Sequence, residues 1–239
     1  MDVKANGLEG FFPSKTDKIN IRWTEDMKQQ EKGYDFENRY STITYRTVKG
    51  DTEELSTSGS DKEENEFSEN AKWIAFKTQF FAQVLVADVP VEIASMKSEQ
   101  LQKGSGYLKT YSADFAASFD PKGVKPTSFH LYLGPNKFST LANNEDMISK
   151  TDDLDLQSLV YMGWPVIKWI NRLVFLYAFD FLTSLGMNMG IILVILTIIV
   201  KILVFPLMKK SYLSSANMRV LRPKVDEISA KYPKKEDAM

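Results

Sequence analysis

Residues 191–208 read IILVILTIIVKILVFPLM, an apolar run of eighteen residues that contains a single charge. At the rise of an α-helix the run spans roughly 27 Å, close to the thickness of the hydrocarbon core of a bilayer. Apolar side chains surround its whole circumference, whereas a helix of a water-soluble protein usually keeps one polar face. The run therefore predicts a transmembrane helix, which we place at residues 188–208.

Lys201 is the charged residue of this run, and two interpretations of it remain open. A cation in the middle of a bilayer costs on the order of 2.5–3.5 kcal/mol, so it usually faces protein or water and serves a function. Alternatively, its long stem reaches towards the interface near Lys209 and acts as an anchor. Pro206 is expected to kink the helix or to lie where the helix nears water.

Composition excludes several classes of protein. The 239-residue chain has a formal net charge of −1, which gives no case for nucleic acid as a partner. It has no cysteine, which excludes disulfides, thiol catalysis and cysteine-ligated metal. A mean hydropathy of −0.25 fits one membrane segment attached to a water-soluble domain. The start of the chain lacks the pattern of a signal peptide, so we expect the chain to be a fragment.

Residues 1–152 predict a β-rich domain, because short alternating stretches are separated by turn residues such as Gly134–Pro135–Asn136. In residues 73–87, Trp73 and Ala75 alternate with Ile74 and Phe76, which is typical of a strand or strand pair. Such a pattern favours an antiparallel sandwich. The expected strands lie in residues 19–23, 40–48, 73–87, 106–119 and 128–134.

Residues 51–70 hold eight carboxylates against one lysine, Lys62. They are open to interpretation as a site for a metal or a basic partner, or as a solvated, mobile loop. A calcium loop needs ligands at fixed spacings around a glycine, and this segment has no such pattern. We therefore expect the loop.

Residues 153–187 differ in composition from the preceding domain. Lys168, Asn171 and Arg172 share one helical face, and the segment is rich in tyrosine and tryptophan, which favour the membrane interface. The pattern predicts an amphipathic helix in the plane of the interface. The alternative is a short membrane span at residues 173–187, interrupted by Asp180, although fifteen residues is short for a span.

Basic residues gather after the apolar run. The positive-inside rule places them in the cytoplasm and the β-rich region outside, in the periplasm. From residue 215 onwards, apolar residues recur at helical spacing and have no partner within the sequence, so residues 209–239 are expected to begin a cytoplasmic helical hairpin. The basic residues are Lys209, Lys210, Arg219, Arg222 and Lys224, and the apolar ones are Met218, Leu221, Val225 and Ile228.

Motifs of catalysis are missing from the sequence. His130 is the single histidine and lies in an expected strand, so a structural role is favoured over a metal ligand or catalytic base. There is no phosphate-binding loop, no G-x-S-x-G and no spacing that marks an acid–base pair. We predict no enzymatic function, no cofactor and no metal.

Residues 190–225, GIILVILTIIVKILVFPLMKKSYLSSANMRVLRPKV, closely resemble the YidC family of membrane protein insertases. The shared pattern has a glycine at Gly190, a threonine at Thr197 four residues before the basic Lys201, and an aromatic–Pro–Leu. A Tyr-x-Ser-x-x-x-Met-Arg-x-Leu-x-Pro-Lys segment follows from Tyr212 to Lys224. The resemblance extends over residues 154–233. Residues 72–90 and 129–135 are more weakly similar to the periplasmic domain of the Gram-negative branch, here of a Bacteroidetes-like kind.

The resemblance implies a fold and a mechanism. The outer domain would be a β-supersandwich that lacks some strands, and the membrane part a five-helix bundle around a hydrophilic groove, in the bacterial inner membrane. Thr197 and Lys201 would face that groove, where the basic residue holds acidic residues of a client's tail. The family's usual residue is arginine, and a lysine provides a point charge instead of a planar fork. The implied partners are nascent membrane proteins, the Sec translocon, the ribosome and the lipid bilayer.

A second function remains open. The β-rich region contains many aromatic residues, including Trp23 and Trp73, and a membrane-tethered periplasmic β-sandwich with such residues can bind a glycan or a protein. The same aromatic residues are also typical of a core. An enzyme acting on sugars is a third class, and it would need paired carboxylates in a cleft.

Overall fold

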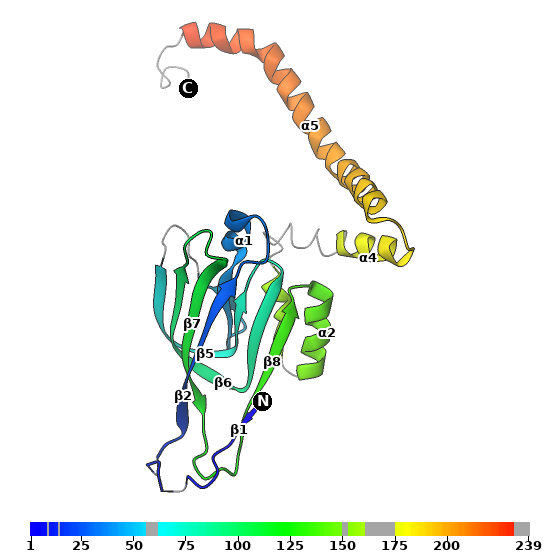
Figure 1. Cartoon of the computed structure of the whole chain (residues 1–239). Coiled ribbons are helices and arrows are strands. Elements are labelled where there is room, and N and C mark those ends of the chain that lie inside the picture. The colour runs from blue at the N-terminus through cyan, green and yellow to red at the C-terminus, as the bar shows by residue number, and fades with distance from the viewer. Residues whose placement is uncertain (9, 14, 56–61, 150–152, 161–174, 232–239) are drawn as a thin grey trace. The chain divides into compact units, whose positions relative to one another are not determined.

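The computed structural model describes residues 1–8, 10–13, 15–55, 62–149, 153–160 and 175–231. The chain divides into two compact units, Met1–Tyr161 and Met162–Met239, which are described separately. The first unit is an antiparallel β-domain with two short helices, and the second is helical (Figure 1). The first unit ends at Tyr161, so residues 153–160 lie with the β-domain and not with the helix expected to begin at residue 153.

The β-domain contains eight described strands. Its strands are β1 (Asp2–Val3), β2 (Lys18–Lys28), β3 (Thr42–Thr47), β4 (Thr52–Glu54), β5 (Lys62–Lys77), β6 (Phe81–Gln100), β7 (Tyr107–Ser118) and β8 (Thr127–Pro135). Its helices are α1 (Tyr34–Tyr40), α2 (Phe138–Ile148) and a single 3₁₀ turn, η1 (Leu156–Leu159).

The long hairpin of β5 and β6 joins two halves of the sheet. The first residues of β6, 81–87, pair with β8, whereas residues 92–100 pair with β7, which in turn pairs with β2. On the other side, the end of β5 pairs with β3, and β3 with β4. The register of β5 shifts between Ala71 and Trp73, and Pro90 lies within β6. Bulges and prolines bend strands, so one hairpin can serve both halves.

Two hydrophobic clusters stabilise the domain. The larger draws residues from both halves of the sheet, with Phe76 stacked on Trp23 at 3.9 Å between ring centroids. The smaller contains Trp73 and Ala75, and lies with leucines of α2 and of residues 153–160. The alternation in residues 73–76 therefore buries both faces of β5, because Ile74 and Phe76 belong to the larger cluster.

The structure confirms the β-rich prediction. All five expected segments form strands, and residues 73–87 are a strand pair, the end of β5 and the beginning of β6. The loop expected at residues 51–70 is wrong in part, because β4 covers Thr52–Glu54 and β5 begins at Lys62. The register pairs residues 62–66 of β5 with residues 95–99 of β6. Residues 56–61 lie outside the described residues.

A polar ladder covers the outer face of β2 and β7. Arg22 donates from Nε to Oδ1 of Asp114 at 2.6 Å and from Nη2 to Oδ2 at 3.2 Å. Ser95 of β6 donates to Oδ2 of the same carboxylate at 3.2 Å. The hydrogen bonds from Arg22, which outweigh the partial burial, lower the pKa of Asp114 below its ordinary value.

The lowered pKa of Asp114 makes the stability of the β-domain depend on pH. An unfolded aspartate titrates near pH 3.9, so the stabilisation is complete above that value and is lost as the pH falls through the lower folded pKa. We expect Asp114→Asn to lower the melting temperature at about pH 6 and to lower it less at about pH 2. Thermal unfolding followed by circular dichroism measures both, and an equal loss at the two pH values would contradict the assignment.

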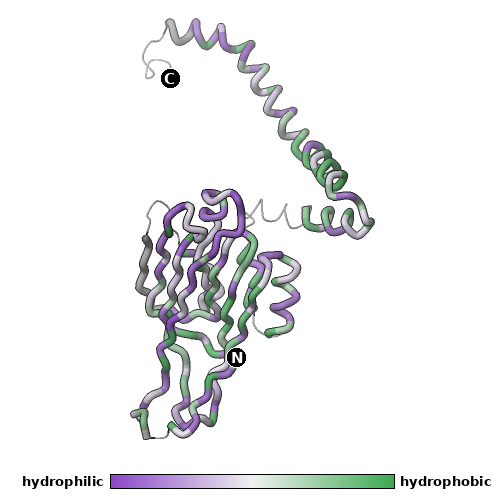
Figure 2. Tube along the Cα trace, in the orientation of Figure 1, coloured by the Kyte–Doolittle hydropathy of each residue, from purple (hydrophilic) through white to green (hydrophobic). Residues whose placement is uncertain are grey.

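The second unit holds α4 (Tyr177–Ser184) and α5 (Met189–Lys231). α5 is one helix of 43 residues that includes both the expected membrane span and the expected start of the cytoplasmic hairpin. Residues Met189–Pro206 have a mean hydropathy of 2.7, and by length and composition this stretch can cross a membrane. Figure 2 shows its first part as hydrophobic and the remainder as mixed. Of the interfacial helix expected at residues 153–187, residues 161–174 lie outside the described residues, and α4 covers Tyr177–Ser184.

Candidate functional site

Thr197 and Lys201 lie one turn apart on α5, about 6 Å along the axis. The Thr197 hydroxyl donates to the carbonyl oxygen of Leu193 at 2.7 Å, which leaves its lone pairs free to accept a hydrogen bond. Both side chains are exposed. An ammonium group and a hydroxyl are thus presented together on one face of the helix.

The surroundings of this pair are apolar and uncovered within the described structure. Only 6% of the window Met189–Pro206 is buried. Ile198 and Phe205, which share the face of Lys201, expose 51% and 65% of their surface. A lone cation among such side chains attracts an anion strongly when water is scarce, because the low dielectric weakens screening.

The basic residues expected in the cytoplasm continue along α5. Lys209, Lys210, Arg219, Arg222 and Lys224 are all exposed. Met218, Leu221 and Val225 expose 66%, 47% and 50% of their surface, so the described part of the apolar stripe is uncovered. The side chain of Ile228 lies outside what the structure describes. Pro206 lies inside the helix, where its missing N–H leaves the carbonyl of Ile202 without the usual partner.

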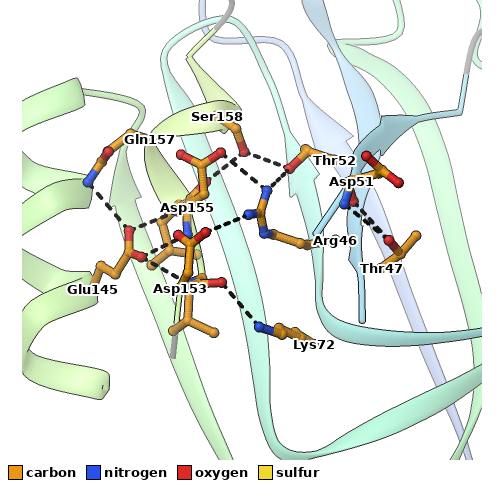
Figure 3. A network of polar contacts seen from close by, with 12 residues as sticks. Arg46, Thr47, Asp51, Thr52, Lys72, Glu145, Asp153, Asp155, Gln157 and Ser158 are labelled. Atoms are coloured by element: carbon orange, nitrogen blue, oxygen red, sulfur yellow. Dashed lines mark hydrogen bonds and ion pairs between the residues drawn. The ribbon is translucent and has the colours of Figure 1, made fainter. Parts of the chain in front are cut away.

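A second polar arrangement holds residues 153–160, the exit segment, against the β-domain (Figure 3). Arg46 of β3, with a side chain 6% exposed, reaches Asp153 and Asp155, each at 3.2 Å. The same guanidinium donates to the Thr52 hydroxyl at 2.9 Å, and Thr52 is also hydrogen-bonded to Ser158 at 2.9 Å. Five strands, β4 to β8, lie in the sequence between Arg46 and the two aspartates that it meets in this network.

Backbone groups of the exit segment are also satisfied by side chains. The Glu145 carboxylate of α2 accepts hydrogen bonds from the N–H groups of residues 154–156, at 2.7–3.0 Å. Trp73 donates from Nε1 to the carbonyl oxygen of Leu154 at 2.7 Å, and Lys77 from Nζ to that of Leu159 at 3.2 Å. Since Leu154, Leu156 and Leu159 are buried, the segment belongs to the core and not to a linker.

The sequence pattern did not reveal the exit segment. Its leucines at 154, 156 and 159 follow neither the period of a strand nor a long helix, and η1 is a single turn. Asp155 adopts a left-handed conformation with φ 44°, which aspartate tolerates better than most residues. The cluster of Asp152, Asp153 and Asp155 was the available signal, because acidic residues near a buried arginine form pairs.

Two further candidates have plain structural roles. Nε2 of His130, in β8, lies 3.0 Å from Oδ1 of Asp88 at the surface. Among the described residues, no group of three histidine or acidic side chains is placed to hold a metal. Trp73 is fully buried and Trp23 stacks on Phe76, so the two tryptophans that suggested a binding module serve the core.

Comparison with known proteins agrees with this architecture. Residues 14–177 match the YidC periplasmic domain, and residues 181–239 match the 60Kd inner membrane protein family. The chain belongs to the YidC family. In these terms, the β-domain is a YidC periplasmic domain and α5 lies in the inner membrane protein match. The family assignment made from residues 190–225 is thus confirmed.

Relatives named membrane protein insertase YidC align with 99% of the chain. The protein from Phocaeicola vulgatus is 47% identical over 237 residues, and that from Bacteroides fragilis is 46% identical over the same length. The protein from Parabacteroides distasonis is 40% identical. The chain spans 38%, 38% and 37% of the length of these three relatives.

Proposed function

We propose that this chain provides the periplasmic domain and the groove-lining helix of a membrane protein insertase. The observation that carries the proposal is Lys201, the one charged residue of the exposed apolar stretch Met189–Pro206 of α5, with the Thr197 hydroxyl one turn away. The names of the relatives support the same function. In this arrangement α5 crosses the inner membrane at residues 188–208, and residues 209–239 begin a cytoplasmic hairpin.

The mechanism follows from the cost of moving acidic residues through a bilayer. A carboxylate in a client's extracytoplasmic tail loses hydration as it enters the membrane, and an ammonium group in a wet groove offsets that loss. Lysine has three rotatable donors, so it can hold a carboxylate transiently and release it as the client's helix moves into lipid. Thr197 offers a further polar contact on the same face. No covalent step is needed.

The proposed surroundings follow from the distribution of charge. The basic residues beyond Met208 favour a cytoplasmic position, which leaves the β-domain in the periplasm. The exposed basic and apolar residues of the C-terminal part of α5 are suited to contact a client or the ribosome. The Sec translocon is a further proposed partner.

The decisive experiment replaces Lys201 in the full-length protein. A hydrogen bond to a charged group contributes about 1.5–3 kcal/mol, so we expect Lys201→Ala to slow the insertion of clients with acidic tails by about tenfold or more. Lys201→Arg should preserve insertion, because the charge remains. Complementation of a depleted strain and protease protection of a client's tail measure the effect.

Lys122→Ala is the control, since it removes the same side chain from an exposed position of the β-domain. It should leave insertion unchanged. A client whose acidic tail residues are replaced by asparagine and glutamine should be insensitive to Lys201→Ala. Normal insertion of acidic clients by Lys201→Ala would show that Lys201 is an anchor.

A further inference from the structure

One end of the β-domain exposes a group of aromatic side chains that the core does not use. Phe36 and Tyr40 lie on α1, Phe80 lies in the turn between β5 and β6, and Phe81 begins β6. They expose 54%, 36%, 48% and 49% of their surface respectively. We call these four residues the aromatic rim. Large aromatic side chains usually occupy cores or interfaces, so a group of them half exposed on one end is costly in water.

Three residues of the rim, Phe36, Tyr40 and Phe80, line an open hollow of about 370 Å³. Leu159 and Val160 line the same hollow. The rings of Phe36 and Tyr40 lie 5.0 Å apart, in contact with each other. Two segments distant in sequence, the β5–β6 turn and α1, therefore bring aromatic rings to the same opening.

The exit segment ends at this opening. Leu159 is held by Lys77 and by Asn136, whose Nδ2 donates to its carbonyl oxygen at 3.4 Å. Val160 is next, and the sequence then continues through residues 161–174 (YMGWPVIKWINRLV) towards α5. The rim is thus at the point of the β-domain from which the chain leaves for its membrane helix. The opposite end carries the β7–β8 connection (Figure 1).

The chemistry of the rim suits the boundary between lipid headgroups and acyl chains. Phenylalanine rings enter the acyl region, while a tyrosine hydroxyl and an arginine remain among phosphates and water. Arg39, exposed on α1 between Phe36 and Tyr40, provides that cation. We propose that the aromatic rim inserts into the periplasmic face of the membrane that α5 crosses, and so sets the β-domain against the lipid. This inference rests on the proposed position of α5.

The absence of cysteine allows a direct test. A single cysteine introduced as Phe80→Cys and labelled with the fluorophore NBD reports on contact with lipid. The full chain is reconstituted into nanodiscs of phosphatidylethanolamine and phosphatidylglycerol, with or without a spin-labelled lipid carrying its doxyl group near the headgroup. Because the rim lies at the interface, we expect NBD emission at position 80 to fall about twofold with the spin label.

Val124→Cys is the matched control, since Val124 is 76% exposed in the β7–β8 connection at the opposite end. It should show no quenching. Equal quenching at both positions, or none at position 80, overturns the proposal. A third reporter, Ile198→Cys on α5, is read with a lipid that carries its doxyl group deep in the acyl chain, because position 198 is at the middle of the stretch Met189–Pro206. If position 198 is quenched by this lipid and position 80 is not quenched by the headgroup-level label, the rim proposal fails alone, whereas no quenching at 198 also refutes the membrane position of α5.

Discussion

Trp73→Ala is expected to lower the free energy of unfolding of the β-domain by about 3–5 kcal/mol, through the cavity that a deleted indole leaves. Trp73, a residue of β5, is 0% exposed and lies in the same hydrophobic cluster as the leucines of the exit segment. The variant also deprives the carbonyl oxygen of Leu154 of its donor, and a buried group without a partner costs about 1–3 kcal/mol more. Whole domains are stable by only about 5–15 kcal/mol. Much of the variant should therefore be unfolded in mild denaturant.

Urea titration followed by far-UV circular dichroism measures this loss without relying on indole fluorescence. Trp73→Phe is the matched variant, because it keeps most of the apolar volume and removes the N–H donor. It should cost about 1–3 kcal/mol, the price of the orphaned carbonyl. Phe11→Ala, at a side chain 81% exposed, should change stability by less than about 0.5 kcal/mol. A Trp73→Ala variant as stable as Phe11→Ala would show that the exit segment does not pack on Trp73.

Alternation of side chains accounts for most of what the sequence could predict in the β-domain. A strand with one buried face shows a period of two, and residues 19–23 and 106–119 have it because β2 and β7 each keep an outer polar face. The ends of the strands are harder to predict. β2 extends beyond the expected residues 19–23 to Lys28, through polar residues that also suit a loop. The apolar run of α5 could be predicted as a membrane helix from its length and composition alone, because almost none of it is buried against other described residues.

The remaining features depend on contacts between residues far apart in sequence. The polar first half of β5 forms a strand because it pairs with β6. No local pattern in residues 62–70 predicts this pairing. α1 is short, and its buried Glu37 accepts hydrogen bonds from the N–H groups of Gln30 and Glu31, an arrangement specific to this loop. The exit segment is tied by Arg46 across 107 and 109 positions. Local propensity carries no information about such pairings.

For Lys201, too, one part of the prediction follows from the local sequence and another part depends on distant contacts. Its spacing from Thr197 and its apolar neighbours identify a special helix face, and the structure places both residues on that face. Whether the face lines a groove depends on which helices pack around it. Within the window Met189–Pro206 the buried residue is Ile192, which does not share the face of Thr197 and Lys201. The groove therefore stays a prediction that the Lys201 variants test.

Removing both carboxylates from Arg46 is expected to cost about 3 kcal/mol of unfolding free energy, near the lower end of the range for breaking a buried ion pair. The guanidinium is 6% exposed, while Asp155 and Asp153 are 34% and 80% exposed. Solvent reaches the aspartates, so their attraction is partly screened, but Arg46 itself has little access to water. The loss therefore arises mainly from leaving a buried cation without a counter-charge.

The double variant Asp153→Asn, Asp155→Asn tests this with the backbone preserved, since asparagine adopts the left-handed conformation of Asp155 as readily as aspartate does. Adding Arg46→Met removes the orphaned charge and keeps much of its volume. The triple variant should regain most of the lost stability, because replacing a whole buried pair with apolar groups is often neutral. Urea unfolding compares the three proteins. If the triple variant is no more stable than the double one, the cost lies in lost hydrogen bonds to the exit segment and not in the buried cation.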